Sequence, residues 1–298
     1  MILISHLSSP FDMLLANRSR ASHGRIWSLY SRRFYTSNRL AKKNVFITGA
    51  SSGIGEACAR EFAKEGSNLI LAARRLSRLE ALKDDICKTH SDIEIHTMEL
   101  DVRDKRRIDA AVASLPVKDE IDVLVNNAGL VLGVDYLKDV TEEAYDTMFD
   151  TNVKGLVFLT QALLPSMIAR GSGHIINIGS VAGKQSYPGG SIYCATKHAV
   201  DAITKALLYE CMETPIRVSQ ICPGLVDTEF STVRFHGDKA RADSVYEGLQ
   251  PLVGQDIAEL VTFTASRPPH VNICDMLVFP TAQADAKTAH RKKQKITQ

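Results

Sequence analysis

The chain has 298 residues, of which 45% are hydrophobic and 23% charged, and its formal net charge is +2. This is the composition of a soluble globular protein with enough apolar side chains for a full core, so it excludes a chain disordered throughout. Because the net charge is small and no run of about 18 apolar residues occurs, we expect neither a nucleic-acid partner nor a membrane span.

Residues 1–35 differ in composition from the rest of the chain. They contain five arginines, many serines and a single acid, Asp12, a composition typical of a mitochondrial transit peptide. The stretch Arg33–Ser37 resembles a site that a matrix protease cuts two residues after an arginine. We therefore expect residues 1–42 to be an N-terminal extension and the protein to be mitochondrial. An uncleaved extension on a cytoplasmic protein, or an upstream start codon that is seldom used, would explain the same composition.

From residue 43 onward, strand-like and helix-like segments alternate. Strands are predicted at 45–48, 68–73, 94–102, 121–125, 174–178, 216–221 and 275–279, and helices at 54–66, 76–90, 142–170 and 193–211. Strands that alternate with helices form βαβ units and a parallel sheet covered on both faces. The sequence therefore predicts a single doubly wound α/β domain of the Rossmann type over 43–285. A basic tail, 286–298, follows it.

A glycine-rich loop joins the first predicted strand to the first predicted helix. Its candidate binding residues are Gly49, Ser51, Ser52, Gly53, Ile54 and Gly55. Glycines at such a position let backbone N–H groups approach a pyrophosphate, and the helix N-terminus adds partial positive charge. The spacing G-x-x-x-G-x-G between a strand and a helix therefore predicts a dinucleotide-binding loop.

The end of the second predicted strand indicates which dinucleotide is bound. An acid at this point would bind the ribose 2′-hydroxyl of NAD, but the strand runs directly into Arg74 and Arg75. A guanidinium forms charge-assisted bonds with a 2′-phosphate, whereas a carboxylate would repel it. We therefore expect NADP as the cofactor. A solvated start of the next helix is the alternative explanation, and it suits Arg75 better than Arg74.

A serine, a tyrosine and a lysine stand where proton transfer would need them. Ser180 ends the fifth predicted strand, where the crevice-facing groups of an open α/β sheet lie. Tyr193 and Lys197 follow on a predicted helix, on which residues four apart share a face. An ammonium about 4 Å from a phenol contributes about 4 kcal/mol at an effective dielectric constant near 20, which would lower the phenol pKa by about three units. We therefore expect Tyr193 to be poised near neutrality as a general acid/base.

Together, and in this order, these motifs are similar to those of the short-chain dehydrogenase/reductase family. Further matching segments are Asn126-Asn127-Ala128-Gly129, Asn152, Pro223-Gly224 and Thr228. The resemblance covers nearly all of 43–285. It implies an oxidoreductase that transfers a hydride between a nicotinamide cofactor and a carbon bearing a hydroxyl or carbonyl group.

The resemblance also implies roles for individual residues. Tyr193 would be the general acid/base, Lys197 would lower its pKa and hold the nicotinamide ribose, and Ser180 would orient the substrate oxygen. Asn152 would hold a water in a proton relay. The remaining cofactor positions are Asp101 and Val102 at the adenine, Asn127 at the adenosine, Val226 and Thr228 at the nicotinamide carboxamide, and Pro223. Asn126 is interpreted as a buttress of the sheet.

Within this family, longer stretches resemble the NADP-dependent 3-hydroxy acid dehydrogenases. These stretches are 186–197, 223–237 and 279–283. That resemblance implies a homotetramer that oxidises small 3-hydroxy acids such as serine and allo-threonine. The carboxylate of such a substrate needs a cation in a closed crevice. Arg234 is the first candidate because its planar fork matches a carboxylate, and Lys184 is the second.

Two other functions fit parts of the same pattern. A 3-oxoacyl-thioester reductase of fatty acid synthesis would suit a mitochondrial address, and a cofactor-binding scaffold without catalysis would keep the fold alone. The scaffold is disfavoured because both Tyr193 and Lys197 are present. The six cysteines are scattered without a C-x-x-C motif, so no metal site or disulfide framework is predicted.

Overall fold

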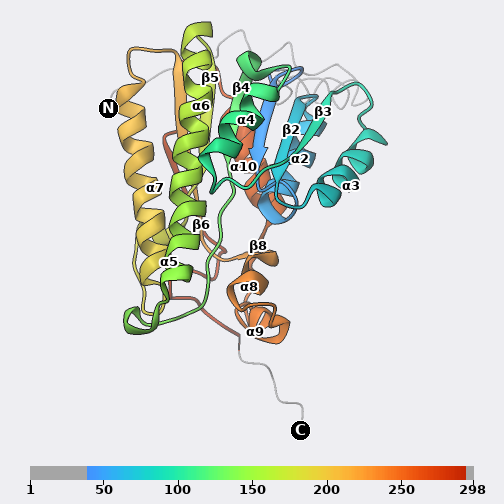
Figure 1. Cartoon of the computed structure of the whole chain (residues 1–298). Coiled ribbons are helices and arrows are strands. Elements are labelled where there is room, and N and C mark those ends of the chain that lie inside the picture. The colour runs from blue at the N-terminus through green and yellow to red at the C-terminus, as the bar shows by residue number, and fades with distance from the viewer. Residues whose placement is uncertain (1–38, 293–298) are drawn as a thin grey trace, which may run out of the picture. The chain divides into compact units, whose positions relative to one another are not determined.

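The computed structural model describes residues 39–292 of the chain (Figure 1). The expected transit peptide and the last residues of the basic tail lie outside this range. The described part contains a seven-stranded parallel sheet with the order β3-β2-β1-β4-β5-β6-β9. Its strands are β1 (Asn44–Thr48), β2 (Asn68–Ala73), β3 (Ile95–Glu99), β4 (Ile121–Asn126), β5 (Gly173–Ile178), β6 (Ile216–Pro223) and β9 (Asp275–Val278). This arrangement confirms the predicted doubly wound fold class, and its strand order reverses direction between β1 and β4.

The sheet is buried on both faces, which explains why its central strands read as continuous apolar runs. In β1, Val45 and Ile47 belong to one hydrophobic cluster, and Phe46 between them belongs to a second cluster on the other face. Successive side chains of a strand point to opposite faces. A strand such as β1 therefore needs apolar residues at every position.

Helices cover the two faces of the sheet. The first cluster is completed by α2 (Gly53–Lys64), α3 (Leu76–Cys87) and α10 (Gly254–Ala265). The second is completed by α4 (Lys105–Ser114), α6 (Gly155–Arg170) and the end of α7 (Ser191–Glu210). Of these helices, α4 and α10 were not predicted from the sequence. The predicted third strand was also too long, since β3 ends at Glu99.

The long helix predicted at 142–170 contains an irregular turn. It consists of α5 (Glu142–Phe149), a π-helical segment η3 (Asp150–Lys154) and α6. Among the described residues, this one continuous helix is long and apolar enough to cross a membrane. Leu159, Leu163 and Met167 from its second half are fully buried in the core beneath the sheet, which explains the apolar composition without a membrane.

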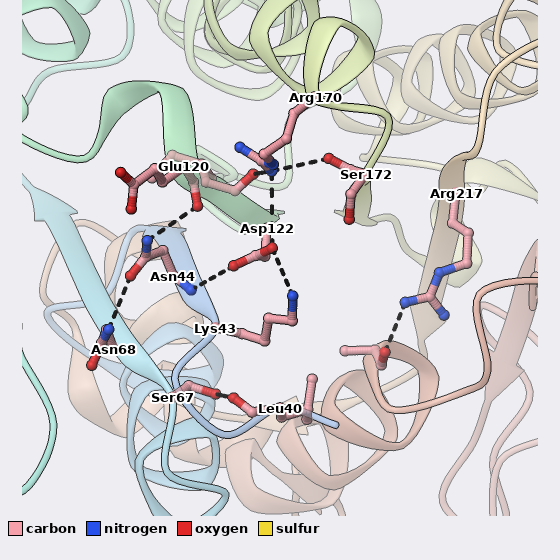
Figure 2. Close-up of polar contacts among 12 residues, drawn as sticks. Leu40, Lys43, Asn44, Ser67, Asn68, Glu120, Asp122, Arg170, Ser172 and Arg217 are labelled. Atoms are coloured by element: carbon pink, nitrogen blue, oxygen red, sulfur yellow. Dashed lines mark hydrogen bonds and ion pairs between the residues drawn. The ribbon is translucent and has the colours of Figure 1, made fainter. Parts of the chain in front are cut away.

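A polar network fastens the amino ends of the strands (Figure 2). The carboxylate of Asp122, at the start of β4, accepts hydrogen bonds from the Lys43 ammonium and the Asn44 backbone N–H, both at 3.0 Å. Arg170, at the end of α6, donates to the Ser172 carbonyl at 2.9 Å. The polar groups at this edge of the sheet form hydrogen bonds with one another, so we interpret their role as structural. The opposite edge, at the carboxyl ends, is left for binding.

After β6 the chain forms a small cap of short elements. They are β7 (Val226–Asp227), α8 (Glu229–Arg234), α9 (Lys239–Ser244) and β8 (Leu252–Val253). The segment after β9 fastens this cap. The buried Gln283 side chain accepts a hydrogen bond from the Leu225 N–H at 2.8 Å, and Arg291 donates to the carbonyls of Glu247 and Val245.

Candidate active site

A cleft opens at the carboxyl ends of the strands and contains most of the predicted cofactor residues. Those that line it are Gly49, Ser51, Ser52, Gly53, Ile54, Arg74, Arg75, Asp101, Val102, Asn127, Tyr193, Lys197, Pro223, Val226 and Thr228. Ser180 lines it as well, whereas Gly55, Asn152, Lys184 and Arg234 do not. The cleft therefore brings together the glycine loop, the end of β2, the start of α7 and the cap.

The glycine loop needs two of its glycines for different reasons. Gly49 has a φ of +65°, a conformation that side chains other than glycine rarely adopt. A Cβ on Gly55 would lie only 2.4 Å from the carbonyl oxygen of Gly49, so this glycine allows α2 to begin tightly against the loop. The Asn127 amide braces the same turn by donating to the Thr48 carbonyl at 2.8 Å. The loop is thus a preformed backbone cradle of the kind that binds a pyrophosphate.

The two arginines after β2 differ in how they are used. Arg75 donates to the hydroxyls of Ser51 and Ser52 at 3.0 and 2.9 Å, and pairs with Glu229 at 2.9 Å. Arg74 also lines the cleft and is exposed, but it forms no hydrogen bond or ion pair with any residue of 39–292. Arg74 is therefore the guanidinium available to a phosphate, and Arg75 holds the glycine loop and α8. The cradle and this cation fit a dinucleotide that carries a 2′-phosphate.

Asp101, expected at the adenine, and Asn126, expected to support the sheet, are both engaged with protein groups. The Asp101 carboxylate is bound by the Arg103 side chain at 2.7 Å, and this bond lowers the Asp101 pKa. Asn126 donates to Thr160 and to Asn177, each at 2.9 Å. Asn126 is thus the buttress between β4, β5 and α6 that the sequence indicated. Asp101 still lines the cleft.

Ser180, Tyr193 and Lys197 meet at the other half of the cleft. Ser180 lies two residues after the end of β5, and its hydroxyl caps the short helix η4 (Val181–Gly183) by accepting from the Ala182 N–H at 3.0 Å. Tyr193 lies in the first turn of α7 and packs edge-to-face on Phe230 of α8, with ring centres 5.7 Å apart. Lys197 lies one turn later and donates to the Ile178 carbonyl at 2.9 Å. All three are buried but face the cleft.

The electrostatics of this group differ from the expectation. Burial raises the pKa of Tyr193 above its ordinary value, and Tyr187 adds to the increase, while hydrogen bonding to Ser180 and the charge of Arg234 only partly oppose it. Burial also lowers the pKa of Lys197 to about 8. The expected near-neutral phenol was therefore wrong for this structure, because desolvation outweighs the nearby charges. A phenol in this state keeps its proton at neutral pH and can donate it.

Asn152 lies in the π-helical segment η3 and does not reach the cleft. Its side chain exchanges two hydrogen bonds with the Leu130 backbone, both at 2.8 Å, and donates to the Thr196 hydroxyl at 3.0 Å. Thr196 is adjacent to Lys197 on α7. The π turn places Asn152 between the segment after β4 and α7. The expected role of Asn152 in holding a relay water stays a prediction.

The two cations expected to bind a substrate carboxylate have different surroundings. Lys184 forms ion pairs with Asp201 and Asp275, so its charge is already used by the protein, and it lies outside the cleft. The Arg234 guanidinium stands 5.9 Å from the Tyr187 ring centre and donates to the Gly133 carbonyl. It forms no ion pair with a residue of the described range. Arg234 does not line the cleft either, but its charge is not taken up by an ion pair in the described range and acts on Tyr193. Arg234 is therefore the better candidate, and Lys184 is not supported as a substrate ligand.

Other features of the site have weaker signals in the sequence. Two residues that were not singled out from the sequence line the cleft, Glu229 and Phe230. A third, Gln283, holds the backbone at the start of the cap. All three lie within the stretches that carry the family resemblance. Across residues 39–292, no cluster of three or more histidine, cysteine, aspartate or glutamate side chains could hold a metal ion.

Comparison with known proteins identifies the family. A model of the family described as short chain dehydrogenase matches residues 43–239. The chain belongs to the short-chain dehydrogenase family.

Several members of the family are close in sequence. An NADP-dependent 3-hydroxy acid dehydrogenase of Schizosaccharomyces pombe is 46% identical over 258 residues, which is 86% of this chain and 99% of the relative. A sulfoacetaldehyde reductase of Chromohalobacter salexigens is 45% identical, over 80% of this chain and 94% of the relative. A solved serine dehydrogenase in a closed form with NADP⁺ is 42% identical. Its TM-score is 0.77, and the match covers 84% of this chain and 100% of that structure.

Proposed function

We propose that this short-chain dehydrogenase uses NADP(H) to interconvert the hydroxyl and carbonyl groups of small 3-hydroxy acids. The observation that carries the proposal is one continuous cleft. It has the glycine cradle and Arg74, which pairs with no residue of 39–292, at one end, and Ser180, Tyr193 and Lys197 at the other. The relatives named above support both the cofactor and the class of substrate.

The protein residues in this proposal bind, orient and move a proton. Bound NADP(H) supplies or accepts the hydride. The Tyr193 phenol donates its proton to the carbonyl oxygen during reduction, and in its deprotonated form, the phenolate, it accepts the proton of the hydroxyl during oxidation. The Ser180 hydroxyl, beside the phenol, orients that oxygen. Lys197 holds the nicotinamide ribose, and the apolar wall that Phe230 adds beside Tyr193 excludes water from the reacting groups.

A substrate panel tests the proposal. Serine, allo-threonine and other short 3-hydroxy acids would be oxidised with NADP and with NAD, and sulfoacetaldehyde and a 3-oxoacyl thioester would be reduced with NADPH. We expect the highest kcat/KM for a 3-hydroxy acid with NADP. A higher value for sulfoacetaldehyde would move the assignment to that reductase activity, which also needs a cation for its substrate anion. Preference for the thioester would replace the hydroxy-acid assignment.

Arg234 provides a prediction about the substrate carboxylate. Arg234→Ala is expected to raise KM for the acid by about 10–150-fold. This corresponds to about 1.5–3 kcal/mol, the range for a hydrogen bond to a charged group. The methyl ester should change far less. Because Arg234 also donates to the Gly133 carbonyl, any loosening of the cap affects acid and ester alike, so the acid-to-ester ratio of KM isolates the charge.

The matched control is Arg241→Ala. This neighbouring arginine of the cap stacks on Phe235 at 4.6 Å and should leave the ratio unchanged. If Arg234→Ala shifts KM for acid and ester by the same factor, the substrate carboxylate binds elsewhere.

The location and assembly of the protein are also proposed. The arginine-rich, acid-poor residues 1–35 support mitochondrial import with cleavage near Tyr35. N-terminal sequencing of the protein from fractionated cells is expected to give a mature end near residue 36. An intact Met1 in the cytosolic fraction would favour the cytoplasmic alternative. A homotetramer stays a prediction from the family resemblance.

A further inference from the structure

Lys184 is the centre of an ion-pair cluster outside the cleft. Its ammonium binds Asp201 of α7 at 2.5 Å and also binds Asp275, the first residue of β9. The Lys184 and Asp201 side chains are only 20% and 16% exposed. Burial alone would lower the pKa of Lys184, but the two carboxylates raise it to about 12. The ammonium is therefore charged at neutral pH, and Lys184 and Asp201 are largely shielded from water, whereas the Asp275 side chain is 42% exposed.

The position of this cluster relates it to the reacting groups. Lys184 directly follows η4, the single turn that Ser180 caps. At Gly183 this turn is seated on α7 so closely that a Cβ there would lie 2.5 Å from the Lys197 carbonyl oxygen. Asp201 is four residues beyond Lys197, one helical turn along the same face. Lys184 thus reaches from the Ser180 loop to the turn of α7 that follows Lys197.

We propose that Lys184 is a positioning residue that fixes the Ser180 loop on the helix carrying Tyr193 and Lys197. The proposal rests on the roles given above to Ser180 and Tyr193. Asp201 also pairs with Lys205, but among the described residues only Lys184 pairs with both Asp201 and Asp275. Without its ammonium the two carboxylates would lose the cation that joins them and would repel each other more strongly. The Ser180 loop would then lose its ion pair with α7, while the packing of Gly183 against Lys197 would remain. Misplacing a catalytic group by about 1 Å can cost about 100-fold in rate. A small shift of Ser180 relative to Tyr193 would therefore be enough to lower kcat.

The test compares Lys184→Met with the wild-type chain. We expect kcat to fall by about 10–100-fold, to the same extent for an acid and for its methyl ester, with the dissociation constant of NADP within about twofold. Amide hydrogen exchange over 180–186, measured without substrate or cofactor, should become faster. Lys184→Arg should restore most of the activity because it keeps the charge. Lys105→Met, which removes the exposed pair with Asp109 on α4, is the matched control and should change neither readout.

Several results would overturn the proposal. Unchanged kcat and unchanged exchange in Lys184→Met would show that the cluster does not position Ser180, and a loss confined to the KM of acids would make Lys184 a substrate ligand. If the methionine variant does not fold, Asp275→Asn is measured instead. It removes one of the two ion pairs and should give a smaller loss of kcat with faster exchange at the same residues. A wild-type chain inactive on every substrate would reject the proposed function, while the exchange measurement would still decide the role of Lys184.

Discussion

Replacing Tyr193 by phenylalanine is expected to lower kcat by about 10²–10⁴-fold, the contribution typical of a general acid or base. The change removes one hydroxyl and keeps the ring, so the edge-to-face contact with Phe230 and the fold should persist. The NADPH dissociation constant, measured by fluorescence titration, should change little. The expected result is therefore a loss in kcat with cofactor binding retained.

The control for this prediction is Tyr209→Phe. Tyr209 lies on the same helix with 73% of its surface exposed, and its hydroxyl lines no part of the cleft. It should leave kcat unchanged. If Tyr193→Phe kept more than about a tenth of wild-type kcat, the proton-transfer role would have to pass to another group.

Arg74→Asp should have the largest effect on the choice of cofactor. In the described range this guanidinium has no protein partner, so its charge is free to bind a 2′-phosphate. The substitution replaces attraction with repulsion at that phosphate. The dissociation constant for NADP is expected to rise by at least roughly 10–150-fold, which corresponds to a loss of about 1.5–3 kcal/mol of binding free energy. NAD, which lacks the phosphate, should bind within a few-fold of its original affinity, and calorimetric titration of both dinucleotides gives the comparison.

Arg106→Asp provides the same change of charge at a site on α4 where the side chain is 94% exposed. It controls for the effect of net charge on anion binding and should affect both dinucleotides slightly and equally. Equal, large losses for NADP and NAD in Arg74→Asp would instead assign Arg74 to supporting the glycine loop.

The elements that position the cofactor were predictable because their signals are local. β1, the glycine loop and the start of α2 form one uninterrupted stretch, and the glycines are required by backbone geometry within it. The helices α4 and α10 were missed although a signal exists. Ile257, Val261 and Ala265 of α10 are buried at four-residue spacing. In α4, only Ile108 and Val112 are buried among charged neighbours, so its apolar stripe is thin.

Properties that depend on distant residues could not be predicted. Lys184 and Arg234 looked alike as loop cations, yet the partners of Lys184 lie 17 and 91 residues away in the chain. The pKa of Tyr193 was misjudged for a related reason. The expectation included the nearby ammonium, four residues away, but left out the burial of the phenol by groups such as Tyr187 and Phe230, which only the folded chain brings together.

The C-terminal segment after β9 has a consequence for inherited variation. Gln283 holds the backbone of Leu225, and the backbone of Lys292 donates to the Gly248 carbonyl, so the last described residues support the cap that contains Phe230 and Arg234. A nonsense mutation just beyond Pro280 would spare every strand of the sheet and every residue that lines the cleft. Such an allele would nevertheless encode an enzyme whose cap has lost its fastening. Stop codons shortly after Pro280 are therefore expected to behave as loss-of-function alleles.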